Sequence, residues 1–223
     1  MSKYYAVSVG REPGIYRSWA DCQKQTVKFS GAIFKSFTTE KEAKEFLNLN
    51  QPSKDLSDDN LCVIYTDGSH QRSKNYLGIG AYCNYKDKEY RMSKECDTEM
   101  LERYGLEEYQ NVCSNPTAEF LAFTEVLERL KGRELSPKLT IVFKIDYIGI
   151  GMWIRKEWQC NEPYIRIIRD RALELMKHIE CVIRIEHIKG HSGIPGNEEA
   201  DKCAGDHENY SNFRKLGRAL EKD

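Results

Sequence analysis

Four acidic residues, far apart along the chain, stand where side chains from different elements can meet. Asp67 and Asp146 each follow an apolar run typical of a buried strand. Glu119 lies near the start of a helical pattern, and Asp201 lies in a short helix after a glycine-rich loop. Ligand sites of α/β proteins form beyond the carboxyl ends of strands, so the four carboxylates are expected to converge at one end of a sheet.

Such a convergence would favour divalent cations. Carboxylates within a few ångströms repel one another, and their pKa values rise unless positive charge compensates. A ligand set made only of oxygen atoms favours Mg²⁺ or Mn²⁺. Two such ions about 3.5–4 Å apart promote in-line displacement at phosphorus, which makes phosphodiester hydrolysis the hypothesis. Position alone leaves a second interpretation open, because aspartate after a strand is often only a turn residue or a helix cap.

The elements that carry these acids are typical of an α/β domain. Residues 61–66 form an apolar run that predicts a central strand ending at Asp67, and residues 78–83 and 88–93 indicate weaker antiparallel neighbours. Asn115 is expected to cap the helix that carries Glu119, with Pro116 at its first position. Further elements are expected as a strand at 139–145, a helix near 165–179, a strand at 181–188 and a helix at 197–205. Three strands followed by alternating helices and strands predict a mixed sheet.

A polar stretch at residues 50–60 is interpreted as a linker. It separates a unit of residues 1–49 from a larger unit of residues 61–208, which a polar tail of residues 209–223 follows. The first unit is predicted to have strands at 4–9, 15–17 and 33–37, one helix capped by Ser18 and a second that starts with a capping box at Thr39. Units this small have thin cores and usually persist as binding modules.

Local sequence around the acids supports the catalytic interpretation. The segments are Tyr65-Thr66-Asp67-Gly68-Ser69, Ala118-Glu119, Asp146, and Gly190-His191-Ser192-Gly193-Ile194-Pro195-Gly196-Asn197-Glu198-Glu199-Ala200-Asp201. In this order and spacing they resemble the four-acid signature of type 1 ribonuclease H over residues 61–205. The resemblance implies a ribonuclease H-like mixed five-stranded sheet with flanking helices.

The first unit independently resembles the viroplasmin-like module that binds RNA/DNA hybrids at the front of many such enzymes. The matching segments are Tyr4-Tyr5-Ala6-Val7, Gly10-Arg11, Gly14-Ile15-Tyr16, Ser18-Trp19, Cys22 and Phe34-Lys35-Ser36-Phe37. Two resemblances in the familiar order reinforce each other. Together they imply a small α/β hybrid-binding module joined to a catalytic domain.

What the resemblance implies is an endonuclease that hydrolyses the RNA strand of RNA/DNA hybrids and leaves 5′-phosphate and 3′-hydroxyl ends. Two Mg²⁺ ions are implied, with Mn²⁺ as a substitute. By position Asp67 would bridge both ions, while Glu119 and Asp146 would hold the ion near the nucleophilic water. Asp201 would bind the ion on the leaving side, and His191 would assist proton movement or product release.

The resemblance also implies substrate contacts in the catalytic domain. Gly68, Ser69 and Asn115 match positions near the RNA strand, whose 2′-hydroxyls distinguish it from DNA. Trp158 and Asn161 are candidates for the DNA strand, although tryptophans such as Trp153 and Trp158 are at least as often core residues.

The hybrid-binding module carries a second set of implied contacts. Tyr5, Trp19, Phe34 and Lys35 would meet the DNA strand, and backbone amides near Lys28 and Gly31 would face RNA hydroxyls. Without the resemblance, Trp19 and Phe34 would be interpreted as core residues of a small domain.

Composition narrows the class of protein. The chain has 223 residues, 40% apolar and 31% charged, with a net charge of −1, which excludes a disordered or collagen-like chain. Residues 1–50 hold eight Lys/Arg against five Asp/Glu, whereas the remainder holds 26 against 30, so a basic front precedes an acidic body.

The eight cysteines are widely spaced and are expected to be reduced, mostly buried thiols. No apolar membrane span or secretory signal is evident, so we expect a soluble cytoplasmic protein with no membrane partner and no obligate protein partner.

Two other functions stay open at this point. The front module could dominate, making the chain a hybrid-binding protein whose nuclease is idle. The second unit could also be a different metal nuclease of the same general fold, such as a resolvase or an exonuclease.

Overall fold

The computed structural model describes residues 3–29, 32–50, 60–71, 76–109, 114–190, 192–206 and 210–221, without the side chains of residues 45 and 48–50. The chain forms two compact units, Met1–Asp55 and Leu56–Asp223. Most of the predicted linker, residues 51–59, lies outside the described residues. Among the described helices, none combines the length and the apolar character needed to cross a membrane.

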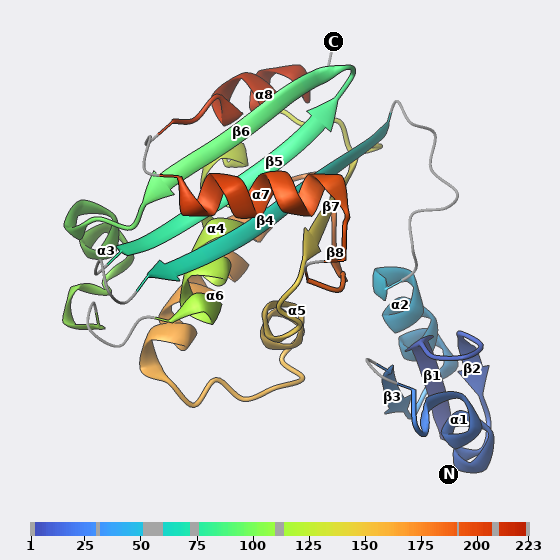
Figure 1. The fold of residues 1–223 in the computed structure, drawn as a ribbon. Helices are drawn as coiled ribbons and strands as arrows, with labels where there is room; N and C mark the ends of the chain where they lie inside the picture. The colour runs from blue at the N-terminus through green and yellow to red at the C-terminus, as the bar shows by residue number, and fades with distance from the viewer. Residues whose placement is uncertain are drawn as a thin grey trace. The chain divides into compact units, whose positions relative to one another are not determined.

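The first unit is a three-stranded antiparallel sheet with two helices (Figure 1). Its elements are β1 (Tyr4–Val9), β2 (Gly14–Tyr16), α1 (Trp19–Thr26), β3 (Ile33–Phe37) and α2 (Glu40–Asn50), and the strand order is β2-β1-β3. Both predicted helix starts are confirmed. Ser18 Oγ accepts a hydrogen bond from Asp21 N at 3.1 Å, and Thr39 exchanges hydrogen bonds with Glu42 as a capping box does.

The second unit contains a mixed five-stranded sheet in the order β6-β5-β4-β7-β8. Its strands are β4 (Leu61–Gln71), β5 (Tyr76–Tyr85), β6 (Lys88–Glu95), β7 (Thr140–Ile145) and β8 (Val182–His187). β4 pairs antiparallel with β5 and parallel with β7, so β4 is the central strand and the point where the sheet changes direction. The predicted fold class, a ribonuclease H-like mixed sheet with flanking helices, is confirmed.

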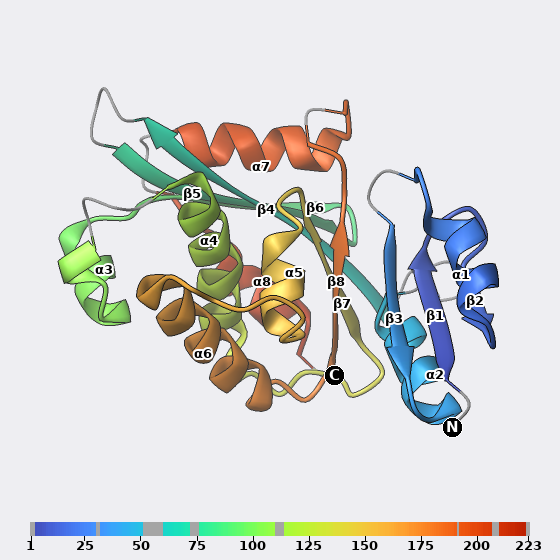
Figure 2. The ribbon, with the colours of Figure 1, turned by 90° about the horizontal axis from the view of Figure 1, so that it is seen from below.

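Helices cover both faces of this sheet. They are α3 (Thr98–Tyr104), α4 (Asn115–Leu130), α5 (Gly149–Ile154), α6 (Pro163–Lys177), α7 (Pro195–Gly205) and α8 (Phe213–Ala219), with a 3₁₀ turn, η3, at Glu107–Tyr109. Figures 1 and 2 show α7 on one face, and α4 with α5 and α6 on the other. The core lies mainly between α4 and the sheet, where Phe120 and Phe123 are completely buried.

β4 is longer than the sequence predicts. The apolar run ends at Thr66, but pairing with β5 continues through Asp67↔Gly80 to Gln71↔Tyr76. Asp67 therefore lies inside a strand rather than at its end. The physical reason is that β4 loses only its parallel partner, β7, after Tyr65 and keeps its antiparallel partner on the other side.

The start of α4 also corrects an expectation. Ser114, not Asn115, is the N-cap, and Ser114 N donates to Thr117 Oγ1 at 3.3 Å. Asn115 is the first helical residue and is exposed. Thr117 is the reason, because its hydroxyl three residues after Ser114 completes a reciprocal capping arrangement there. The side chain of Asn115 is consequently not needed as a cap.

Two short α-helices, α3 and α5, were not predicted. Asp97 caps α3 by accepting a hydrogen bond from Met100 N at 2.8 Å, and Gly105 ends this helix with φ +67°. α5 follows Asp146 closely and buries Trp153. Short helices of this kind have too few apolar repeats to show a period in the sequence.

The C-terminal segment packs against the second unit. Ser93 N donates to Tyr210 O at 2.7 Å, and Asn212 N donates to Arg91 O at 3.1 Å, so residues 210–212 cover the edge of β6. α8 then buries Phe213 and Leu216. α8 thus lies within the stretch predicted as a polar tail, and the described part of that tail belongs to the packed unit.

The cysteines behave as expected. Seven of the eight lie among the described residues, and all seven are buried thiols that take part in no disulfide there. Cys62 Sγ and Cys83 Sγ, on neighbouring strands, lie 3.5 Å apart as a thiol pair. Cys113 lies outside the described residues.

Candidate active site

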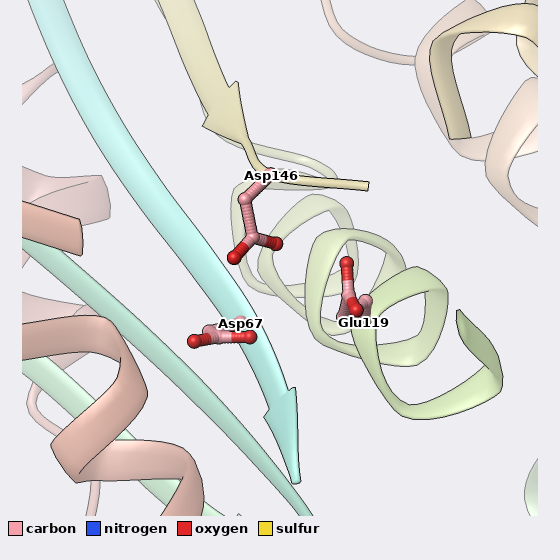
Figure 3. A group of neighbouring side chains, drawn as sticks. All are labelled: Asp67, Glu119 and Asp146. Carbon is pink, nitrogen blue, oxygen red and sulfur yellow. The ribbon is translucent and has the colours of Figure 1, made fainter. Parts of the chain in front are cut away.

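Asp67 and Asp146 occupy equivalent positions on neighbouring parallel strands. The last register pair of β4 and β7 is Tyr65↔Lys144, and each aspartate lies two residues beyond it. Side chains two residues apart along an extended strand share a face, so the two carboxylates leave the sheet on the same side. Figure 3 shows them close together beside the end of β7.

Glu119 reaches the same place from α4. This helix packs directly on β4 at Gly68, where a side chain would collide with the helix backbone: a Cβ would lie 2.5 Å from Ala118 C. Glycine in a strand commonly marks such a close approach of another backbone. As a result, one carboxylate oxygen from each of Asp67, Glu119 and Asp146 lies within 4.8 Å of the others (Figure 3).

The site raises the pKa of two of its acids. Asp67 is only 6% exposed, and burial, followed by the charge of Asp146, raises its pKa to about 7. Burial, followed by the charges of Asp146 and Asp67, raises the pKa of Glu119 to about 9. Gly68 N donates a hydrogen bond to Asp67 Oδ1 at 2.7 Å, which lowers the pKa of Asp67 but does not cancel the increase.

These carboxylates fit a divalent cation. Glu119 Oε2 and Asp146 Oδ1 are buried, and neither has a hydrogen-bond partner among the described residues. A buried carboxylate oxygen without a donor is costly, and a bound cation offsets that cost. The donor set contains only oxygen, which suits Mg²⁺ or Mn²⁺ better than zinc or copper.

The fourth predicted acid stands slightly apart. Asp201 lies on the exposed side of α7 and is not part of the group of three within 4.8 Å. Its charge nevertheless contributes to the raised pKa of Asp67, so the two side chains are within electrostatic reach. His191 lies outside the described residues.

Comparison with known proteins identifies the family. Residues 59–208, well over half of the chain, match the sequence model of the family described as RNase H. The chain belongs to the ribonuclease H family. It is therefore a hydrolase, and its carboxylate cluster is the candidate metal site of a ribonuclease H. Residues 3–47 match a second family model, described as the ribonuclease H1 N-terminal domain.

Individual relatives match different shares of this ribonuclease H. Ribonuclease H1 of Mus musculus is 24% identical over 276 aligned positions, which cover 92% of this chain and 88% of the mouse protein. Ribonuclease H of Crithidia fasciculata is 50% identical over 44 residues, 20% of this chain and 9% of that protein. The crystal structure of RNase H1 from Halobacterium salinarum NRC-1 has 21% sequence identity and a TM-score of 0.46, and the match covers 65% of this chain and 95% of that one.

The structure separates the two tryptophans after Asp146. Trp153 is buried and stacks on Phe120 with ring centroids 5.6 Å apart. Trp158 is 43% exposed, and Asn161 is exposed as well. Trp153 is thus a core residue of this ribonuclease H, whereas Trp158 and Asn161 are free to meet a ligand.

In the first unit, the predicted contact residues form an exposed aromatic cluster. Trp19 is 45% exposed and Phe34 is 41% exposed. The Trp19 ring lies 5.7 Å from the rings of both Tyr5 and Phe34, so α1, β1 and β3 each contribute one ring. Lys35 and Lys28 are exposed, and Gly31 lies outside the described residues.

One residue of the ribonuclease H site was missed. Tyr147 follows Asp146 directly, and its ring packs on Trp153 with centroids 5.5 Å apart. Burial and the charge of Glu119 raise the pKa of its phenol, which places Tyr147 beside the carboxylate cluster. The signal in the sequence was its position next to a candidate metal ligand.

Proposed function

We propose that this enzyme cleaves the RNA strand of RNA/DNA hybrids endonucleolytically with two divalent cations and leaves 5′-phosphate and 3′-hydroxyl ends. The observation that carries the proposal is the meeting of Asp67, Glu119 and Asp146 within 4.8 Å in a member of the ribonuclease H family. Three carboxylates at this separation concentrate negative charge where few donors neutralise it. Such a site is suited to binding cations next to a phosphate.

Each acid has a proposed role. Asp67, whose pKa is raised by the charges of both Asp146 and Asp201, would contact both ions. Glu119 and Asp146 would hold the ion on the side of the attacking water, and Asp201 would hold the ion on the side of the leaving oxygen. Bound Mg²⁺, or Mn²⁺ in its place, would supply the positive charge that activates water and stabilises the leaving group. His191 stays a predicted participant in proton movement or product release.

Selection of the RNA strand is proposed to depend on groups at the edge of the site. Gly68 and Ser69 in β4 and the exposed Asn115 at the start of α4 would contact ribose 2′-hydroxyls. Asn115 is available for this because Ser114 caps the helix. Trp158 and Asn161 would contact the DNA strand, and their exposure supports this role.

The first unit is proposed to hold the hybrid. Tyr5, Trp19 and Phe34 would lie against deoxyribose rings, since exposed aromatic rings are a common platform for nucleic acid strands. Lys35 would contact a DNA phosphate. Backbone amides near Lys28, whose φ is +57°, and near Gly31 would face RNA hydroxyls.

The parts of the chain are proposed to have distinct roles. Residues 1–49 are the hybrid-binding module, residues 50–60 the linker and residues 61–208 the catalytic domain. Residues 209–223 form a C-terminal extension, whose described part stays packed on the catalytic domain through β6.

A cleavage assay tests the proposed function. The purified chain would be incubated with a labelled RNA/DNA hybrid, duplex DNA and duplex RNA, each with Mg²⁺, with Mn²⁺ and with a chelator. Cleavage of the RNA strand of the hybrid alone, dependent on metal, is the expected result. Failure to cleave at any metal concentration would favour a binding protein with an idle nuclease. Cleavage of duplex DNA would favour a resolvase or an exonuclease.

A further inference from the structure

α7, the helix that carries Asp201, packs so closely on the sheet that its backbone contacts the backbone of β5 at Gly80. Figure 1 shows it crossing β5 and β4. At Gly80, in the middle of β5, a Cβ would lie 2.2 Å from Ala200 O and 2.4 Å from Ala204 N. These are backbone atoms of α7, which cannot rotate away as a side chain does. The helix therefore occupies the volume that any side chain at position 80 would need.

The place of this contact is directly beside the catalytic carboxylates. Gly80 is the cross-strand partner of Asp67 in the β4–β5 register. Ala200, whose carbonyl lies over Gly80, immediately precedes Asp201 in α7. The separation between α7 and β5 at this contact therefore affects how close Asp201 comes to Asp67.

We propose that Gly80 is a positioning residue for the metal centre: its lack of a side chain lets α7 pack closely enough on β5 to bring Asp201 toward Asp67. The inference rests on the proposed metal-binding role of these two acids. Gly80 touches neither substrate nor reacting atoms and acts only through the depth of the helix.

Other contacts hold α7 in place along its length. Near its start, Gly196 lies against the ring of Tyr65, where a Cβ would be 2.2 Å from a ring carbon. At its end, Tyr76 OH donates to Ala204 O at 3.2 Å and to Asp206 O at 2.9 Å. With both ends held, a side chain at position 80 would lift the middle of α7, which is the part that carries Asp201.

The test is the Gly80→Ala variant of the full chain, titrated with Mn²⁺ alone in a calorimeter. The added methyl group is expected to weaken Mn²⁺ binding by roughly 10- to 100-fold, as changes behind a metal ligand commonly do. The kcat for hybrid cleavage should fall while the KM for the hybrid stays unchanged. Mn²⁺ binding at the wild-type affinity in the folded variant would overturn the proposal.

Gly78→Ala is the matched control. A Cβ at Gly78 would lie 2.2 Å from Ala204 O, so the steric conflict with α7 is similar but lies past Asp201, toward the end of the helix. We expect this variant to lose thermal stability comparably and to keep more of its Mn²⁺ affinity than Gly80→Ala. Equal losses of affinity would mean that Gly80 has no special role, and would overturn the proposal.

A double-mutant cycle with Asp201→Asn shows whether the effect passes through Asp201. In the Asp201→Asn background, Gly80→Ala should cost little further Mn²⁺ affinity, and additive losses would contradict the proposal. If Asp201→Asn alone changes neither Mn²⁺ binding nor cleavage, the proposed metal-binding role of Asp201 fails instead. The two failures are therefore distinguishable.

A second variant keeps the proposal testable if Gly80→Ala does not fold. Glu199→Gln breaks the ion pair in which Arg91 Nη2 holds Glu199 Oε2 at 2.9 Å, next to Ala200 on α7, and leaves the contact at Gly80 intact. If the depth of α7 is set at Gly80, this variant should bind Mn²⁺ with wild-type affinity. A loss of affinity of 10-fold or more would overturn the proposal.

Discussion

The backbone nitrogen of Glu119 lies directly over the α-carbon of Gly68. A Cβ built on Gly68 would come within 2.2 Å of Glu119 N, closer than two non-bonded atoms can approach. α4 can bring its carboxylate to the strand that carries Asp67 only because position 68 has no side chain. The geometry of the metal site thus depends on a contact between two backbones.

Gly68→Ala should consequently lose most of its activity. The methyl group would push α4 away from β4 and displace Glu119, and a shift of about 1 Å can cost on the order of 100-fold in rate. The measurement is the initial rate of hybrid cleavage at saturating Mg²⁺. Gly205→Ala is the control, because a Cβ there meets nothing within 4 Å, and it should keep the wild-type rate.

Asp67→Asn should abolish turnover and leave hybrid binding intact. The amide keeps the size of the side chain but removes the negative charge at the most buried acid of the site. Cleavage assays and fluorescence anisotropy with a labelled hybrid measure the two properties separately. A variant that retained more than a small fraction of the activity would contradict the proposed role of Asp67 in contacting both ions.

The metal-free protein should lose stability as the pH rises from about 4 to 7. The pKa of Asp67 is about 7 in the folded protein and near 4 in an unfolded chain, so in this range only the folded state keeps the proton. Because the folded state binds more protons, the free energy of unfolding falls with increasing pH. Glu119, with a pKa of about 9, extends the decline to higher pH.

The Asp67→Asn variant tests this prediction, because it removes the contribution of Asp67 to the pH dependence of the free energy of unfolding. In urea unfolding with a chelator, the variant should gain stability over the wild type between pH 4 and pH 7, and the difference should stay constant above. One pKa unit corresponds to about 1.4 kcal/mol, so the gain is on the order of a few kcal/mol. Parallel pH curves for the two proteins would show that Asp67 ionises normally in the folded state.

Mg²⁺ or Mn²⁺ should stabilise the wild-type protein against heat. A ligand that binds only the folded state adds about 2.7 kcal/mol at 100 times its Kd. It also removes the repulsion among Asp67, Glu119 and Asp146, so the rise in Tm should be larger at pH 8 than at pH 5. Thermal unfolding followed by circular dichroism measures the shift, and Glu119→Gln should reduce it strongly.

Trp19→Ala should weaken hybrid binding without slowing the chemical step. Trp19 is the centre of the exposed aromatic cluster, and losing a stacking surface costs about 1–3 kcal/mol per base. Binding isotherms at several salt concentrations and single-turnover cleavage rates test both halves of this statement. Tyr210→Ala is the control, because its ring is 50% exposed in the other unit and has no proposed contact.

Removing residues 1–50 should weaken hybrid binding more than Trp19→Ala does, again without slowing the chemical step. The deletion takes away the basic part of the chain, so affinity and processivity should fall most steeply at high salt. The cleavage rate of bound hybrid should persist. An unchanged dependence of affinity on salt would contradict the assignment of the front unit as the hybrid-binding module.

Much of the fold could be predicted from local pattern. The capping box at Thr39 and the helical period of α6 depend on neighbouring residues, and the structure reproduces them. The extension of β4 past Thr66 could not be predicted in this way. It depends on pairing with β5, because the residues of β4 after Thr66, Asp67-Gly68-Ser69-His70-Gln71, are polar and give no apolar signal of a strand.

The exposure of the aromatic residues was also decided at the tertiary level. The residue type alone does not show whether a ring is buried or exposed. Trp153 is buried, whereas Trp19, Phe34 and Trp158 are exposed. Burial depends on which surfaces the rest of the chain covers, and a unit as small as the first has little chain available to cover them. The sequence alone therefore did not decide whether each of these rings packs in a core or contacts a ligand.

The sequence by itself predicted the kind of chemistry, metal-dependent phosphodiester hydrolysis. The number, type and order of the acids, and the residues beside them, can be read directly from the sequence. Only the tertiary structure decided that Asp67, Glu119 and Asp146 meet, that Asp201 stands slightly apart, and that Gly68 and Gly80 let two helices approach. The reason is physical: distances between elements are set by packing of backbones against each other, and no property of a single segment records them.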